Sequence, residues 1–376
     1  MKNKFWIKIV LGSFFIVIFL VCAINYIVDP YGIYNTNFFK NKPFSHTQMR
    51  IVKASKTAEI KPSSIVLGTS RAEIAINPNH NYFIQPAYNL AVTGSTLYES
   101  KLFLQNAIKT GKLKQVLLVA DWRMFNEEKM RKVPDVDNYF NPFFKYAYLL
   151  NFKTLKNSYA TFKNKDGRDQ HYSNGQMDNY FLTEYIHLSG GHLKVMNNDE
   201  KTYYSNFTKN NTYKDTKKSS FDDFKDILKM CYENNIKLDI VFGPSHIRQW
   251  ESFDYHLGIN NFYDWKKSVV KVVDDESKKY KKAPFRVVDF SIYHSLTAEV
   301  VPTDPLAKME YHFEGSHYKE KLANIMLDTL NVSSNYNDFG VELNLNNIDE
   351  HLERLKNDRT KYIDTKKYRK EVFGEN

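Results

Sequence analysis

The chain is poor in cysteine, with two such residues among 376. Cys22 lies inside an apolar run and Cys231 stands alone in the remaining sequence, so no intrachain disulfide is expected. A spaced set of metal ligands is also missing, because His312 near Glu314 has no further cysteine or histidine at a suitable interval. We therefore expect neither a disulfide framework nor a bound metal or cofactor.

The sequence lacks a second long hydrophobic run, and residues 1–28 contain no acidic side chain. The one such run extends from Ile9 to Val28 and is preceded by three lysines. About twenty apolar residues match the hydrocarbon thickness of a bilayer. Lysines before such a run place the N-terminus in the cytoplasm. The sequence thus predicts a single-pass anchor, residues 1–28, in the inner membrane, with the rest of the chain periplasmic.

Three other interpretations of this run were weighed. A cleaved signal peptide is compatible with Val21-Cys22-Ala23, but the apolar run continues beyond it to Val28. Lipidation at Cys22 is disfavoured by the bulky Val21, and a buried core helix would seldom be terminal and flanked by lysines. An uncleaved anchor is the interpretation that we retain.

The composition is that of a globular protein, with 42% hydrophobic residues and a net charge of +10. Three positive charges lie in residues 1–28, so the outer part keeps +7. This excess suits an anionic polymer or the membrane surface, although a solvated basic surface explains it equally well. We expect no nucleic-acid partner.

Short β-rich runs alternate with helical patterns between residues 64 and 332. Val116–Ala120 is a continuous apolar run, as in a central parallel strand. This alternation predicts a three-layer α/β/α fold with a central parallel sheet. We expect a juxtamembrane segment over 29–63, a domain over 64–332 with an insertion over 126–218 after the third strand, and a charged tail over 333–376.

The strongest chemical signal is Gly68-Thr69-Ser70, which ends the first expected strand. A serine there lies at the carboxyl edge of the sheet, where open α/β sheets bind ligands. Its N–H would start a helix and favour a developing oxyanion. A simple helix cap is the alternative.

The second signal is Glu314-Gly315-Ser316-His317, just before the last expected helix. An acid three residues before a histidine can hold one ring nitrogen and leave the other to take a proton from a serine. A capped turn with a surface histidine is the alternative. These residues predict a Ser70–His317–Glu314 triad.

Further candidates follow two other expected strands. Gly94 comes after the second strand and could present its N–H to an oxyanion, while Asn89 is either a substrate contact or a strand-end hydrogen bonder. His246 and Arg248 follow the strand at Leu238–Phe242 and are candidate substrate contacts, as is Arg71 beside the serine.

Together, Gly68-Thr69-Ser70, Gly94 and the Glu314-x-x-His317 block resemble the SGNH (GDSL-like) hydrolase superfamily over residues 60–125 and 220–331. The resemblance implies a flavodoxin-like sheet, Ser70 as nucleophile, and the N–H groups of Ser70 and Gly94 as the oxyanion hole. The Gly-Thr-Ser-Arg variant after an anchor looks closest to extracytoplasmic proteins of alginate O-acetylation and teichoic acid D-alanylation. These act beside membrane-bound O-acyltransferases, so the resemblance implies an acyl-bearing envelope polysaccharide as substrate and such a transferase as partner.

Two departures from the family pattern bear on activity. The usual aspartate is Glu314, and the Gly-x-Asn-Asp block after the third strand is replaced by Ala120-Asp121-Trp122-Arg123. An ionised Asp121 cannot donate to an oxyanion, so Arg71, Arg123 or Asn89 helps or the hole is weaker. The chain is therefore expected to be an esterase or O-acyltransferase, or alternatively a non-catalytic subunit of an envelope-polymer modification complex.

Overall fold

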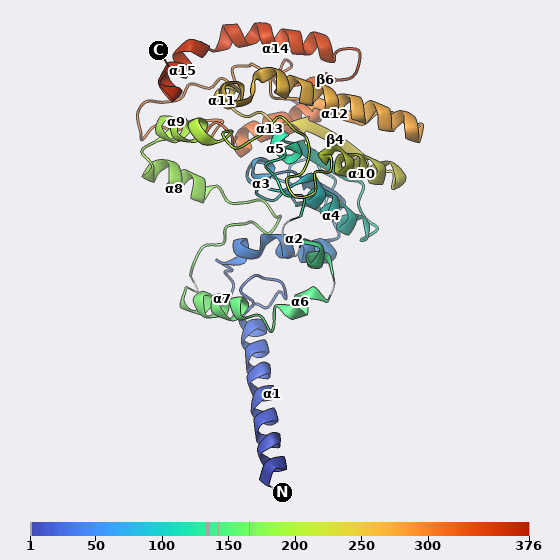
Figure 1. Cartoon of the computed structure of the whole chain (residues 1–376), viewed down its shortest axis with the longest axis vertical. Helices are drawn as coiled ribbons and strands as arrows, with labels where there is room; N and C mark the ends of the chain where they lie inside the picture. The colour runs from blue at the N-terminus through green and yellow to red at the C-terminus, as the bar shows by residue number, and fades with distance from the viewer. Residues whose placement is uncertain (1, 133–135, 142, 165, 376) are drawn as a thin grey trace. The chain divides into compact units, whose positions relative to one another are not determined.

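The computed structural model describes residues 2–132, 136–141, 143–164 and 166–375 (Figure 1). The predicted segments 1–28, 126–218 and 333–376 therefore each include residues outside this set. The chain divides into two compact units, Met1–Glu59 with Pro134–Tyr172, and Ile60–Val133 with Ser173–Asn376. We call them unit 1 and unit 2 and describe each separately.

The first helix of unit 1, α1 (Lys2–Val28), is long and apolar enough to cross a membrane. Its stretch from Lys4 to Val28 has a mean hydropathy of 2.8 and no buried share, which argues against a core helix. No other helix in the described residues meets these criteria. The expectation of one N-terminal apolar helix is confirmed by length and composition.

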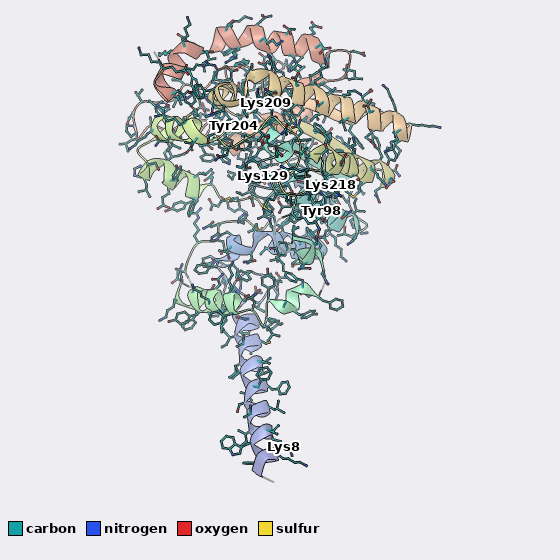
Figure 2. The ribbon with its side chains drawn as sticks, viewed as in Figure 1. Lys8, Tyr98, Lys129, Tyr204, Lys209 and Lys218 are labelled. Carbon is teal, nitrogen blue, oxygen red and sulfur yellow. The ribbon has the colours of Figure 1, made fainter. Side chains whose placement is uncertain are left out.

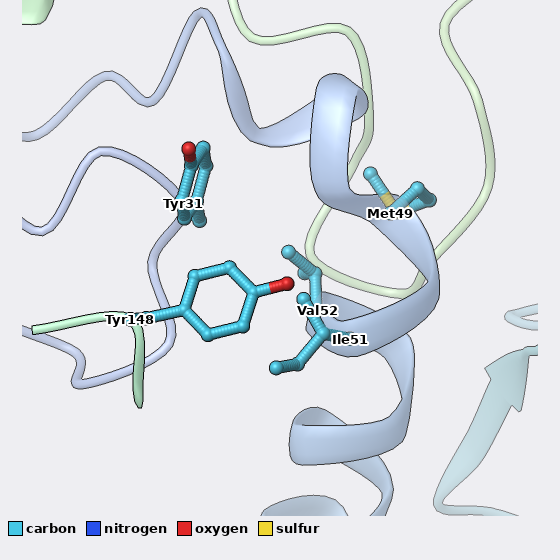
Figure 3. Close-up of a cluster of buried hydrophobic side chains, with 5 residues drawn as sticks. All are labelled: Tyr31, Met49, Ile51, Val52 and Tyr148. Atoms are coloured by element: carbon cyan, nitrogen blue, oxygen red, sulfur yellow. The ribbon is translucent and has the colours of Figure 1, made fainter. Parts of the chain in front are cut away.

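The remaining helices of unit 1 pack around a small aromatic and aliphatic core. Tyr31 and Tyr148 meet edge to face, with ring centroids 5.7 Å apart, beside Ile51 and Val52 (Figure 3). Asn25 near the end of α1 donates to Leu149 O at 2.9 Å and accepts from Ser158 Oγ at 2.9 Å. The unit also contains η1 (Ser45–Gln48), α2 (Met49–Ile60), η2 (Val136–Phe140), α6 (Phe144–Ala147) and α7 (Phe152–Lys163).

Unit 2 is built on a six-stranded sheet of order β2-β1-β3-β4-β5-β6. The first five strands are parallel, and chain order reverses between β1 and β3, the kind of switch point where doubly wound sheets bind ligands. Their bounds are β1 (Ser64–Leu67), β2 (Ala87–Asn89), β3 (Gln115–Ala120), β4 (Lys237–Phe242) and β5 (Arg286–Asp289). The predicted α/β class is confirmed.

The sheet is mixed and not wholly parallel, because β6 (Val341–Leu343) pairs antiparallel with β5. This edge strand lies in the segment expected to be a charged tail. Only one of its three side chains, Leu343, is buried, so the hydropathy pattern gives it little signal. Residues 341–373 thus belong to the fold of unit 2.

Helices of unit 2 pack on the sheet and on one another (Figure 1). α10 (Ser220–Glu233) contacts α4 (Leu97–Ile108) and α12 (Ile259–Tyr280), while α3 (Ser70–Ala75) contacts α13 (Glu320–Leu330). The others are α5 (Trp122–Phe125), α8 (Tyr180–Leu188), α9 (His192–Thr202), α11 (Ile247–Leu257), α14 (Ile348–Tyr362) and α15 (Thr365–Phe373).

Candidate active site

The turn after β1 is shaped so that only glycine fits at its first position. Gly68 has φ +153°, and a Cβ there would lie 2.9 Å from Ala72 Cβ and 3.1 Å from Val119 O. The chain can therefore turn directly into α3, whose first residue is Ser70. Ser70 is half-buried at the carboxyl edge of the sheet.

The loop before α13 brings a histidine to this serine. His317 Nε2 lies 2.7 Å from Ser70 Oγ, across 247 positions of the sequence. His317 Nδ1 bonds Glu314 Oε1, and Glu314 also accepts the backbone N–H groups of Ser316 (2.6 Å) and His317 (3.0 Å). The predicted Ser70, His317 and Glu314 side chains are thus in hydrogen-bond contact.

The ionisation of Glu314 fixes the direction of these hydrogen bonds. Burial alone would raise the pKa of Glu314, but His317, the Ser316 N–H and Arg71 together lower it below its ordinary value. An ionised carboxylate only accepts, so Nδ1 of His317 carries the proton and Nε2 is free to accept the Ser70 hydroxyl proton. This arrangement can activate the serine for attack on a carbonyl.

Gly94 lies in the loop that follows β2 alongside the serine turn. Val92 N donates to Gly68 O at 3.2 Å, and Thr93 donates twice to Glu73 on the serine helix. Gly94 follows with φ +71°. Within the described part of the chain, the N–H groups of Ser70 and Gly94 have no protein acceptor. Both donors are therefore free to bind an anion.

Arg71 is a structural link and not a substrate contact, which corrects the prediction. Its Nη1 lies 2.6 Å from Asp121 Oδ1, and its Nε donates to Ser316 O at 3.1 Å. Asp121 also accepts the Thr69 hydroxyl at 3.1 Å. A single buried ion pair thus connects the serine turn, the end of β3 and the histidine loop.

Asn89, His246 and Arg248 are likewise buried and occupied, so their predicted substrate contacts are wrong. Asn89 Nδ2 donates to two backbone carbonyls of the serine helix region, those of Ala72 and Ile76, at 2.9 Å. His246 Nε2 faces the Glu299 carbonyl at 2.7 Å and its Nδ1 caps α11. Arg248 is held by Glu200, Asn197 and Glu371. Periodicity cannot distinguish such buried polar groups from exposed ones at a strand end.

Asp199 on α9 is a site residue that the sequence did not indicate. Burial raises its pKa to about 6, the charge of Glu314 adds to this rise, and His317 opposes it. This half-buried carboxylate therefore lies near the Glu314–His317 pair. It comes from the stretch predicted as an insertion, where no local motif marks it, so only the fold reveals it.

No group of three histidine, cysteine or acidic side chains is placed to hold a metal ion in the described ranges. The site therefore rests on the serine, the histidine, the carboxylates and the free N–H groups. Comparison of the sequence with protein families and with curated proteins finds no match.

Proposed function

We propose that this protein is a membrane-anchored serine esterase or O-acyltransferase of SGNH type that acts on an acyl-bearing cell-envelope polysaccharide. The observation that carries the proposal is the 2.7 Å contact between Ser70 Oγ and His317 Nε2, with Glu314 on the other ring nitrogen. The order of strands β2-β1-β3-β4-β5 and the placement of these residues at strand ends support the SGNH resemblance. The stretch between β3 and α10 would be the insertion.

In the proposed mechanism His317 takes the proton of Ser70 as Oγ forms a bond to the ester carbonyl carbon. The carbonyl electrons move to oxygen, where the N–H groups of Ser70 and Gly94 stabilise the charge. His317 then protonates the departing alcohol as the ester C–O bond breaks. Water, or a glycan hydroxyl in the transfer reaction, attacks the acyl-serine and releases Ser70.

The location of the reaction follows from α1 and its three preceding lysines. An uncleaved helix would tether unit 2 to the outer face of an inner membrane, within reach of envelope glycans. Asn25 supports the uncleaved form, because its bonds to Leu149 and Ser158 tie the end of α1 to α7. A membrane-bound O-acyltransferase would be the natural source of the acyl group.

The test compares the full chain in lipid nanodiscs with its Ser70→Ala variant, using p-nitrophenyl acetate as substrate. Turnover that is abolished in Ser70→Ala supports an esterase. Cells carrying the variant should also show a changed O-acetyl content of their envelope glycans. Equal turnover by the two proteins together with an unchanged O-acetyl content would favour a non-catalytic subunit.

A further inference from the structure

The oxyanion region contains a cation that no part of the triad uses. Lys129 lies in the loop after α5, and a Cβ placed on Gly94 would be 3.8 Å from its Nζ (Figure 2). The ammonium group therefore lies next to the glycine whose N–H has no protein acceptor. The side chain of Lys129 is 15% exposed, so a charge beside it is only partly screened by water.

The backbone of Lys129 is held in place from both sides. Its N–H donates to Asn126 O at 3.0 Å, and its carbonyl accepts from Lys214 N at 2.8 Å. A donor that is positioned before the reaction needs no reorganisation when charge develops, which is the property that makes oxyanion holes effective.

Other cations near the serine are already engaged. Arg71 is paired with Asp121 at 2.6 Å. The Arg123 guanidinium lies over the rings of Tyr203 (5.5 Å) and Phe207 (5.7 Å). Lys129 by contrast has one partner, Glu128 at 3.4 Å, a distance too long for a strong ion pair.

Charge bookkeeping favours an anion at this position. Glu128 lies between two cations, Lys129 at 3.4 Å and Arg123 at 3.8 Å. One carboxylate cannot neutralise both, so a net positive charge remains beside Gly94. Asp121 is the other carboxylate that acts on Lys129, and Arg71 already balances it.

We propose that Lys129 is a catalytic residue that donates a hydrogen bond to the oxyanion formed on Ser70, alongside the N–H groups of Ser70 and Gly94. As Ser70 Oγ bonds the carbonyl carbon, the carbonyl oxygen gains the electron pair and the Lys129 ammonium stabilises it without giving up its proton. Lys129 thereby fills the place of the amide donor that Asp121 cannot be. This inference rests on the proposed esterase function.

The test measures kcat and KM of the full chain in nanodiscs with p-nitrophenyl acetate. Lys129→Met keeps the length of the side chain and removes its charge, so kcat should fall by about 10²-fold while KM stays near the wild-type value. Lys209→Met is the matched control, because Lys209 is an exposed lysine of the same unit (Figure 2). It should behave as wild type.

A pH profile separates this role from a structural one. Burial and Arg123 lower the pKa of Lys129, and Glu128 and Asp121 oppose this shift. The active, protonated form should therefore be lost on the alkaline side below the ordinary lysine range. In Lys129→Arg that alkaline limb should move to higher pH, since arginine stays charged.

The outcomes are distinguishable. Equal kcat in Lys129→Met and Lys209→Met, with turnover still dependent on Ser70, overturns the role of Lys129 and leaves the esterase intact. An unshifted alkaline limb in Lys129→Arg also overturns it. No Ser70-dependent turnover in the wild type overturns both proposals.

Discussion

The ion pair between Arg71 and Asp121 explains how residues distant in sequence meet at Ser70. Arg71 directly follows the serine, Asp121 ends β3, and the Nε of Arg71 reaches Ser316 on the histidine loop. Breaking a buried pair of this kind leaves an unpaired charge and is strongly destabilising. The geometry of the triad is therefore coupled to the stability of the sheet edge.

Glu314 contributes to stability in a way that depends on pH. Its pKa is lowered from the ordinary 4.5, despite burial, by His317, the Ser316 N–H and Arg71. The folded state thus holds the ionised form more firmly than the unfolded state does. This contribution is fully present above pH 4.5 and is lost as the pH falls through the lowered value.

We predict that Glu314→Gln removes part of this acid sensitivity. Urea unfolding of wild type and variant should give free energies that differ most above pH 4.5 and converge below it. Glu310→Gln, at an exposed carboxylate four positions earlier, should leave the pH profile unchanged. Parallel profiles for wild type and Glu314→Gln would show that Glu314 is not held ionised by its neighbours.

At the level of elements, the strands were predictable where hydropathy alone defines them. The apolar run Val116–Ala120 lies within β3, all of which is buried, and Leu238–Phe242 lies within β4. β6 was missed because an edge strand of three residues has too few buried side chains to form a pattern. Its helix α14 was anticipated only as a short amphipathic piece around Ile348 and Leu352.

Some contacts between elements depend on single polar side chains that no periodicity reveals. His351 Nε2 on α14 lies 2.8 Å from Asp289 Oδ2 at the end of β5, and Lys266 Nζ lies 2.6 Å from the same oxygen. These charges hold the pKa of the buried Asp289 at about 2, although burial alone would raise it. Such a network is specified by the assembled fold and cannot be inferred from local sequence.

Asn25 makes the corresponding contact in unit 1. Replacing it with leucine leaves the Leu149 carbonyl and the Ser158 hydroxyl without their partner, at a cost of about 1–3 kcal/mol. We expect limited proteolysis of the full chain in nanodiscs to cut α7 faster in Asn25→Leu than in wild type. Ile24→Leu, at the exposed neighbouring position, is the control. Equal cutting of all three proteins would mean that Asn25 does not hold α7 in place.

On the scale of the whole molecule, the sequence predicted the elements better than their grouping. Residues 29–63 were expected to be a juxtamembrane segment and 126–218 an insertion. The structure instead combines the first 59 residues with a stretch ending at Tyr172 in one unit. The hydrogen bond from Ser158 to Asn25 spans 133 positions, and no local pattern announces it.

The orientation of the chain is a property of the same scale. Three lysines precede α1 and no acid lies in residues 1–28, so alkaline phosphatase fused after residue 40 should be exported and active. Fluorescence of green fluorescent protein fused at the same point should be lost. An inactive phosphatase with a fluorescent partner fusion would place the chain on the cytoplasmic side.

The central claim is that His317 and Glu314 make Ser70 a nucleophile. Labelling of the full chain with a serine-reactive fluorophosphonate, followed by intact-mass spectrometry, tests it directly. We predict one adduct on the wild type, none on Ser70→Ala and slow labelling of His317→Ala. An unlabelled wild type, or equal labelling of Ser70→Ala, would contradict the account.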